Sequence, residues 1–142
     1  MADGNRLLVP IDGSDHSLRA LAHVIKRVAS DRRLLQIFVL NVQPWLPRSL
    51  FVTPSMIAEH HKAKSKEDLA RAQRMLRRKG LKAEIMVRLG EPGETIAKVA
   101  RQKHCGEIVL GSRGLGSFKG LILGSVTTKV IHAARVPVTV VP

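Results

Sequence analysis

The 142-residue sequence contains one cysteine, no tyrosine, one tryptophan and only 3% aromatic residues. Because Cys105 stands alone, an internal disulfide and a multi-cysteine zinc cluster are both excluded, which favours a reducing compartment. So few aromatics leave little surface on which the bases of single-stranded nucleic acid could stack. No apolar run approaches transmembrane length, and the first residues lack the apolar core of a signal peptide. We therefore expect a cytoplasmic protein without a membrane partner.

Acidic residues are also scarce, since 11 Asp and Glu face 24 Lys and Arg and the formal net charge is +13. Nine of the basic residues lie between positions 62 and 82, where there are only two acids. Such a run is typical of a solvated helix face, and steering of phosphates or an acidic partner also fits it. Nucleic acid is the rival partner, but charge alone supports only salt-sensitive, sequence-blind binding, and no nucleic-acid-binding motif is present. The sequence therefore disfavours nucleic acid.

The chain is long enough for one sizeable core, with 44% hydrophobic residues, and we predict a single domain over residues 1–142. Short aliphatic runs predict strands, and stretches of helical spacing lie between them. The five strand candidates are 7–11, 34–40, 83–87, 108–110 and 138–141. The order βαβαβαβαβ, with nearly continuous apolar strands, predicts a parallel sheet covered on both faces, which is a three-layer α/β sandwich.

Local signals place several helix ends. Ser14 or Asp15 is expected to cap the first helix, Gly80 to follow the second, and Glu91 and Pro92 to open the third. The segment 43–54 contains three prolines and Trp45. We expect it to be a loop with apolar anchors, and its position after a strand makes it a candidate lid.

The most distinctive stretch is GSRGLGSFKGLILGS at positions 111–125, which holds five of the 11 glycines. A glycine-rich turn between a strand and a helix exposes backbone N–H groups to anions such as phosphate. The dinucleotide fingerprint fails because position 119 is lysine, and the Walker A motif fails because Ser117 stands where lysine is required. What remains is Gly111-x-x-Gly114, nine residues, and then Gly124-Ser125.

This spacing resembles the nucleotide-binding signature of the universal stress protein family, G-x-x-G-x9-G-(S/T). The stretches 7–14, 108–114 and 124–138 are also similar to that family's opening strand and turn, fourth strand, and closing helix and strand. Only the region from 43 to about 66 lacks such support. The resemblance implies a Rossmann-like fold with five parallel strands in the order 3-2-1-4-5 and four helices. The winding would reverse between strands one and four, where Asp12 and Gly111 would meet.

The resemblance also implies a site for ATP, or for ADP or AMP, with Mg²⁺ carried on the phosphates. Its residues divide into groups for adenine, ribose and phosphates. Pro10, Ile11 and the Val42 backbone would frame the adenine; Asp12 and the Gly111 backbone would hold the ribose; and Gly114, Gly124, Ser125 and the Val126 N–H would hold the phosphates. These roles suit the chemistry, since carboxylates accept hydrogen bonds from hydroxyl groups and glycines let the backbone approach a triphosphate.

Simpler interpretations stay open for individual residues. The glycine-rich turn could be structural alone, Asp12 could cap the first helix, and Ser125 could be only an N-cap. Residues of the triad types at 12–16 are too close in sequence to form a catalytic triad. His60 and His61 are interpreted as a solvated pair rather than as metal ligands.

The sequence therefore predicts an ATP-binding universal stress protein that acts as a nucleotide-dependent stress-response or signalling module. The alternative is a stress protein that binds nucleic acid or another polyanion and whose glycine loop is only structural. Without a Walker lysine or an evident general base, we expect no catalytic residues and at most slow ATP hydrolysis. Residues 137–142 would form an edge strand, and the resemblance implies a homodimer through it.

Overall fold

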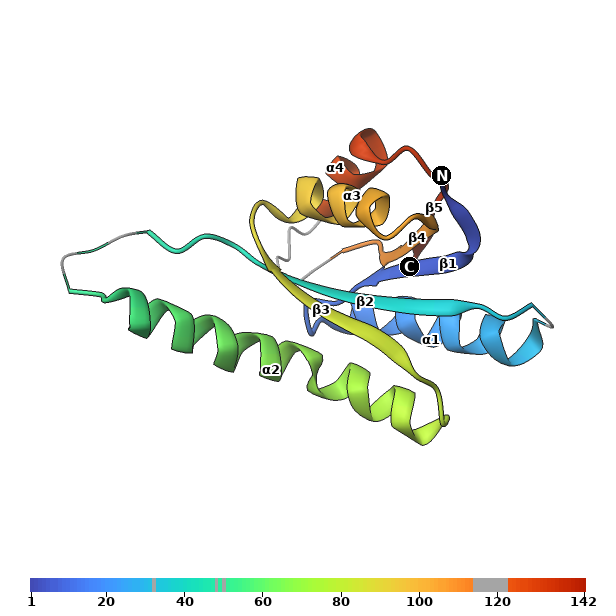
Figure 1. Cartoon of the computed structure of the whole chain (residues 1–142), viewed down its shortest axis with the longest axis horizontal. Coiled ribbons are helices and arrows are strands. Elements are labelled where there is room, and N and C mark those ends of the chain that lie inside the picture. The colour runs from blue at the N-terminus through green and yellow to red at the C-terminus, as the bar shows by residue number, and fades with distance from the viewer. Residues whose placement is uncertain (32, 48, 50, 114–122) are drawn as a thin grey trace.

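In the computed structural model, which describes all residues except 32, 48, 50 and 114–122, five strands alternate with four helices (Figure 1). Their bounds are β1 Asp3–Pro10, α1 Asp15–Ser30, β2 Gln36–Gln43, α2 Pro54–Arg78, β3 Ala83–Leu89, α3 Pro92–Gln102, β4 Cys105–Gly111, α4 Ser125–Ala133 and β5 Val138–Val141. The element order is the one that the hydrophobic pattern predicts. Most strands are longer than their apolar runs, because polar residues also belong to them, and β2 begins after the exposed Leu34 and extends to Gln43.

The strands form one sheet in the order β3-β2-β1-β4-β5, and all the pairings between neighbours are parallel. In the centre of the sheet, Leu8 of β1 pairs with Phe38 of β2 and with Ile108 of β4. From β1 the chain winds outward through β2 to β3, then crosses to β4 and β5. The winding therefore reverses between β1 and β4, as expected, and a crevice opens at the carboxyl ends of these two strands.

Two helices cover each face of the sheet, which gives the predicted three-layer α/β sandwich (Figure 1). Leu7 and Val9 of β1 are fully buried in the core that α1 and α2 share with the sheet. Leu8 points to the opposite face and is fully buried in the core formed with α3 and α4. Successive side chains of a strand alternate between faces, so β1 needs apolar residues at each of these three positions.

The helix ends agree with the expected capping signals. Ser14 is the N-cap of α1, and its side chain accepts a hydrogen bond from the Ser17 N–H at 3.2 Å. Glu91 caps α3 through the Glu94 N–H at 2.7 Å, with Pro92 as the first helical residue. Gly80 follows the C-cap of α2 with φ of +63°, a left-handed conformation that favours glycine.

Helix α2 and the basic run at 62–82 do not coincide. It begins at Pro54, capped by the Thr53 side chain, well before the basic run. It ends at Arg78, so Lys82 lies beyond it. The first part of α2 extends past the sheet, as Figure 1 shows. It buries few apolar side chains, so apolar periodicity marks only the later turns.

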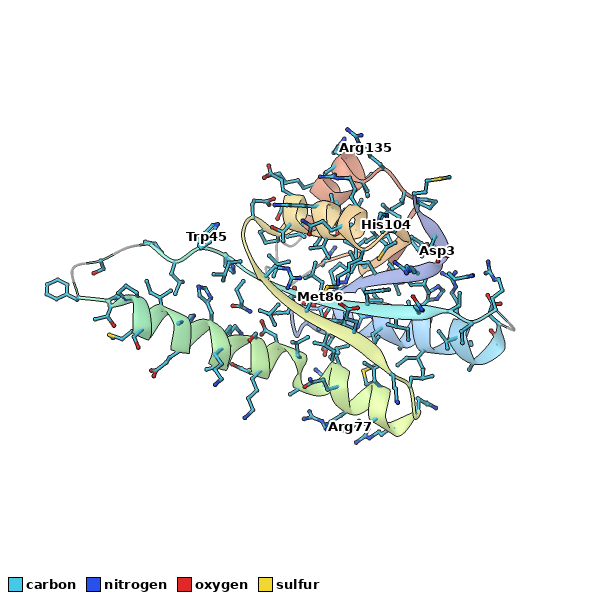
Figure 2. All side chains as sticks on the ribbon, viewed as in Figure 1. Asp3, Trp45, Arg77, Met86, His104 and Arg135 are labelled. Atoms are coloured by element: carbon cyan, nitrogen blue, oxygen red, sulfur yellow. The ribbon has the colours of Figure 1, made fainter. Side chains whose placement is uncertain are left out.

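Side chains on this projecting part are largely exposed. Trp45, on the segment after β2, is 69% exposed. Figure 2 shows Trp45 near the start of α2 and Arg77 near the end of that helix. None of the helices that the structure describes combines the length and apolar character needed to cross a membrane.

Candidate functional site

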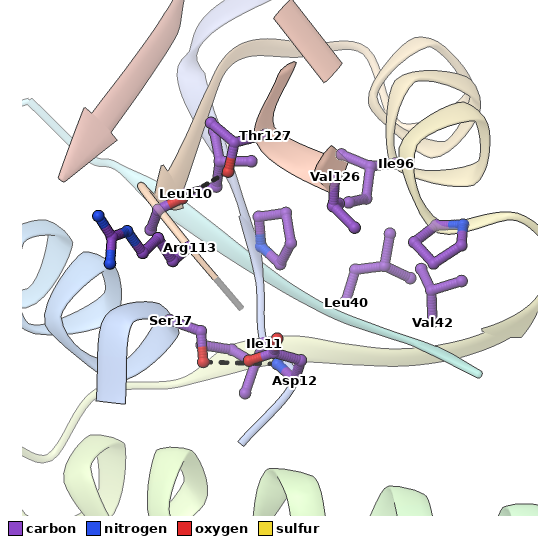
Figure 3. A pocket seen from close by; sticks show the side chains of 13 residues that line it. Ile11, Asp12, Ser17, Leu40, Val42, Ile96, Leu110, Arg113, Val126 and Thr127 are labelled. Atoms are coloured by element: carbon purple, nitrogen blue, oxygen red, sulfur yellow. Dashed lines mark hydrogen bonds between the residues drawn. The ribbon is translucent and has the colours of Figure 1, made fainter. Parts of the chain in front are cut away.

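A cavity of about 120 Å³ lies at the switch point of the sheet, where the carboxyl ends of β1 and β4 diverge (Figure 3). Strand ends form its floor, and the first turns of α3 and α4 close its sides. Its lining residues are Pro10, Ile11, Asp12, Ser17, Leu40, Val42, Pro92, Ile96, Leu110, Gly111, Arg113, Val126 and Thr127. This is the place where open parallel sheets bind their ligands.

The turn after β1 is held by its own side chains. The Asp12 carboxylate oxygen Oδ1 accepts a hydrogen bond from the Ser14 N–H at 2.9 Å, and Gly13 adopts φ of +84°. The Asp12 N–H approaches the Ser17 hydroxyl at 3.4 Å. In the part of the chain that the structure describes, no hydrogen bond reaches the other carboxylate oxygen of Asp12. Asp12 can therefore organise the turn and still accept a hydrogen bond from a ligand hydroxyl.

Gly111 ends β4 directly against the first turn of α1. A Cβ at this position would lie 2.6 Å from the backbone carbonyl atoms of His16, far inside contact distance. The Gly111 carbonyl accepts a hydrogen bond from the Thr127 hydroxyl at 2.8 Å, which ties β4 to α4. Packing alone therefore requires glycine here, whether or not a ligand binds.

Helix α4 begins without a side-chain cap. Its N-cap is Gly124, with φ of −72° and ψ of 163°, and the Gly124 N–H donates to the Ser112 carbonyl at 2.7 Å. The first N–H groups of a helix have no partner within it, and here no cap side chain takes one up. Together with the helix dipole, they favour an anion beside Ser125 and Val126.

The other wall of the cavity is apolar. Leu40 and Val42 reach it from β2, and Pro92 and Ile96 reach it from the start of α3. Val126 completes this wall from α4, as Figure 3 shows. The cavity thus combines an apolar surface, suited to a flat ring, with the Asp12 carboxylate and the positive side chain of Arg113.

The structure brings most of the predicted site residues together. Pro10, Ile11, Asp12, Val42, Gly111 and Val126 all line the cavity. Gly124 and Ser125 lie beside it as the N-cap and first residue of α4, so Ser125 is not the N-cap. Gly114 lies outside the described residues.

Several lining residues were not predicted from the sequence. Leu40 and Leu110 could have been found: Leu40 lies two residues before Val42 and so faces the same side of β2, and Leu110 directly precedes Gly111. Pro92 and Ile96 required knowledge that the start of α3 reaches this edge of the sheet. Arg113 occupies a position that the glycine signature leaves undefined.

Other candidate residues have separate roles. Asp15 forms an ion pair with Arg71 at 2.9 Å, and His16 contacts Arg19, so these residues do not assemble a triad with Ser14. No group of three or more His, Cys, Asp or Glu is placed to hold a metal ion among the described residues.

The histidine pair is not solvated as predicted. His60 is exposed, but His61 is only 8% exposed because it lies on the buried face of α2, four residues before the buried Ser65. Neither ring nitrogen of His61 has a partner within the described residues. Cys105 is the buried first residue of β4, and burial raises the pKa of its thiol to about 11.

Comparisons with known proteins agree with this fold. Residues 4–142 match the universal stress protein family. Universal stress protein YxiE of Bacillus subtilis is 33% identical, over 96% of this chain and 98% of its own length. The solved structure of MJ0577 has a TM-score of 0.76 at 28% identity, covering 96% of this chain and 94% of its own. A family protein from Arabidopsis thaliana with AMP bound has a TM-score of 0.69 at 21% identity, covering 96% and 90%. The chain belongs to the universal stress protein family.

Proposed function

We propose that this protein binds ATP, or ADP or AMP, at the switch point and acts in the cytoplasm as a nucleotide-dependent stress-response or signalling module. One observation carries the proposal. A single cavity unites an apolar wall, a carboxylate with one oxygen that no described residue engages, and a start of α4 that lacks a side-chain cap. These three surfaces match the three chemical parts of a nucleotide.

The adenine would pack against the apolar wall, with Pro10, Ile11 and the Val42 backbone around it and Leu40 and Ile96 behind. The ribose hydroxyl groups would donate to the free oxygen of Asp12, next to the Gly111 backbone. The Arabidopsis protein, which shares the fold, has been solved with AMP bound, and this supports an adenine nucleotide as the ligand.

The phosphates would lie at the N-terminus of α4, held by backbone N–H groups and by the Ser125 hydroxyl. Gly124, Val126 and Gly114 complete this proposed set. Any Mg²⁺ would be carried by the phosphates, since hard cations are commonly bound through them.

The test is a calorimetric titration of Mg-ATP into nucleotide-free protein at about 150 mM salt, for the wild type and for Gly124→Val. A valine would crowd the N–H groups of α4, and the φ of −72° at this position suits any residue, so the helix should still form. We expect saturable binding by the wild type and none by the variant.

Gly4→Val is the matched control, because a Cβ at Gly4 would meet nothing within 4 Å and Gly4 lies at the start of β1. It should bind like the wild type. Equal affinities for Gly124→Val and the wild type would refute a phosphate site at α4.

A change in Trp45 fluorescence on binding would support closure of the segment 44–53 over the nucleotide, and resistance of that segment to proteolysis should rise with it.

Hydrolysis is proposed to be slow at most, because the described lining residues include no histidine or glutamate to act as a general base and no lysine to hold a γ-phosphate. Phosphate release above background in the wild type, absent from Gly124→Val, would make the protein an enzyme.

A homodimer through residues 137–142 is a separate part of the proposal. Strand β5 is an edge of the sheet, and each of its residues is partly exposed. Antiparallel pairing of two such edges would satisfy their open backbone groups. Light scattering should give about twice the chain mass of 15.6 kDa at micromolar concentration.

The exposed basic residues around the end of α2 keep nucleic acid as the second candidate. Arg74, Arg77, Arg78, Lys79 and Lys82 form no ion pair within the described residues. A nucleic-acid binder would keep its DNA affinity in Gly124→Val and lose it steeply as salt rises. A nucleotide module would bind Mg-ATP at moderate salt and lose that binding in Gly124→Val.

A further inference from the structure

Apolar and polar side chains alternate at the end of β2 and point to opposite faces of the sheet. Leu40 and Val42 point into the cavity, whereas Asn41 and Gln43 point to the other face of the sheet, towards α2. Asn41 is 0% and Gln43 only 3% exposed. Two buried amides in a largely aliphatic core destabilise the fold unless they are hydrogen-bonded.

These amides meet a buried carboxylate from α2. Asp68 is 6% exposed, and its Oδ2 accepts hydrogen bonds from Asn41 Nδ2 at 3.2 Å and from Gln43 Nε2 at 3.0 Å. Gln43 Nε2 also donates to Asn41 Oδ1 at 2.6 Å. Lys64, one turn earlier on α2, pairs with Asp68 Oδ1 at 3.0 Å. The carboxylate is therefore compensated on both oxygens.

The network reaches the turn that carries Asp12. Asn41 Nδ2 donates to the Ile11 carbonyl at 2.8 Å, and the Ile11 N–H donates to the Leu40 carbonyl at 2.8 Å. Both polar groups of Ile11 are thus fixed by β2, one residue before Asp12.

Helix α2 also packs directly on the turn. A Cβ at Gly13 would lie 3.2 Å from the Asp68 Cα and 3.3 Å from its Oδ1. In Figure 3, α2 runs along the bottom of the view, beneath Ile11 and Asp12. The backbone on both sides of Asp12 is therefore contacted by Asn41 and Asp68, which do not line the cavity.

We infer that Asp68, Asn41 and Gln43 are positioning residues, which hold the Asp12 turn in the geometry that accepts ribose hydroxyl groups. The inference rests on the proposed nucleotide site. It assigns to α2 a role at that site without contact with the ligand.

Fold stability alone gives no reason for these residue types. Buried ion pairs and polar networks can often be replaced by apolar side chains of similar volume without loss of stability. A polar network does, however, fix one arrangement of the groups it joins, here the Ile11 peptide and the helix behind Gly13.

The test compares two ligands in two near-isosteric variants, Asn41→Leu and Asp68→Asn. The first removes the donor to the Ile11 carbonyl, and the second neutralises the carboxylate while keeping its shape. Mg-ATP and its 2′,3′-dideoxy analogue, which lacks both ribose hydroxyl groups, are titrated into each protein, and urea unfolding is followed in parallel.

The wild type should prefer ATP to the dideoxy analogue. In Asn41→Leu we expect ATP affinity to fall about tenfold while affinity for the analogue is unchanged, so that the preference disappears. Asp68→Asn should show a smaller loss in the same direction, and it keeps the inference testable if Asn41→Leu does not fold.

Ser65→Ala is the matched control. Ser65 lies on the same buried face of α2, but its hydroxyl donates only to the Lys62 carbonyl within the described chain. Both affinities should stay at their wild-type values.

Equal losses for the two ligands, or no loss for either, would overturn the positioning role and leave the nucleotide site standing. Absence of ATP binding by the wild type would overturn the proposed function and this inference together.

Discussion

Gly111 and Gly124 belong to one glycine signature, yet their surroundings differ. Gly111 is enclosed, since any side chain would collide with the His16 backbone at 2.6 Å. Gly124 is partly exposed at the uncapped start of α4, in a conformation open to every residue. One sequence pattern thus joins a glycine that packing requires to a glycine that leaves the start of a helix without a side-chain cap.

The largest effect should come from Gly111→Ala. Because the added Cβ would overlap backbone rather than a movable side chain, α1 and β4 must separate, and we expect a loss of about 3 kcal/mol in the free energy of unfolding. Urea denaturation measures it, with Gly4→Ala as the control for the entropy that alanine removes from the unfolded chain. Unchanged stability would mean that only a ligand requires glycine at 111.

Gly124→Asp should separate stability from binding. Aspartate is a preferred N-cap, so it should raise the free energy of unfolding by a few tenths of a kcal/mol. Its carboxylate would also occupy the N–H groups proposed for the phosphates, so ATP affinity should fall at least about tenfold. Thermal unfolding and calorimetry on the same sample test both; if ATP still binds at wild-type strength, the two glycines do not differ as proposed.

Ser14→Ala removes the side-chain cap of α1 and should lower stability by less than Gly111→Ala. The serine side chain takes up the Ser17 N–H at 3.2 Å, and its loss should reduce the free energy of unfolding by about 1 kcal/mol. Since Ser14 does not line the cavity, ATP affinity should change little. A large loss of affinity would show that the α1 cap also supports ligand binding.

The sequence predicts much of the fold but not the difference between Gly111 and Gly124. The strand order, the helix caps at Ser14 and Glu91, and the meeting of Asp12 with Gly111 at the cavity follow from local patterns and family resemblance. The crowding at Gly111 does not, because it depends on how closely α1 approaches β4.

The start of α2 and the burial of His61 were missed for a related reason. The first turns of α2 carry little apolar periodicity, so only the Thr53 cap and Pro54 mark where it begins. Asn41 and Gln43 appear as polar interruptions at a strand end, and only the tertiary structure supplies Asp68 as their partner. Polar residues whose partners are distant in sequence are thus the least predictable part of the site.

The smallest effect should come from acid, which should lower the free energy of unfolding through Glu107 of β4. Glu107 accepts hydrogen bonds from Arg27 at 2.9 Å and from Thr139 at 2.6 Å, which tie α1 and β5 to β4. Burial alone would raise the pKa of Glu107, but these bonds and the charge of Arg27 lower it below its usual 4.5. A lowered folded-state pKa contributes stability that is present above pH 4.5 and is lost as the pH falls through the folded value.

Glu107→Gln should therefore lower the free energy of unfolding at pH 7 by less than about 1 kcal/mol and flatten its decline below pH 4.5. Urea unfolding of both proteins across this range measures the difference. Parallel pH profiles for wild type and variant would mean that Glu107 is not the group responsible. Because Glu107 lies outside the cavity lining, ATP affinity at pH 7 should match the wild type, unlike that of Gly124→Asp, so a global loss of stability can be distinguished from a local loss of phosphate contacts.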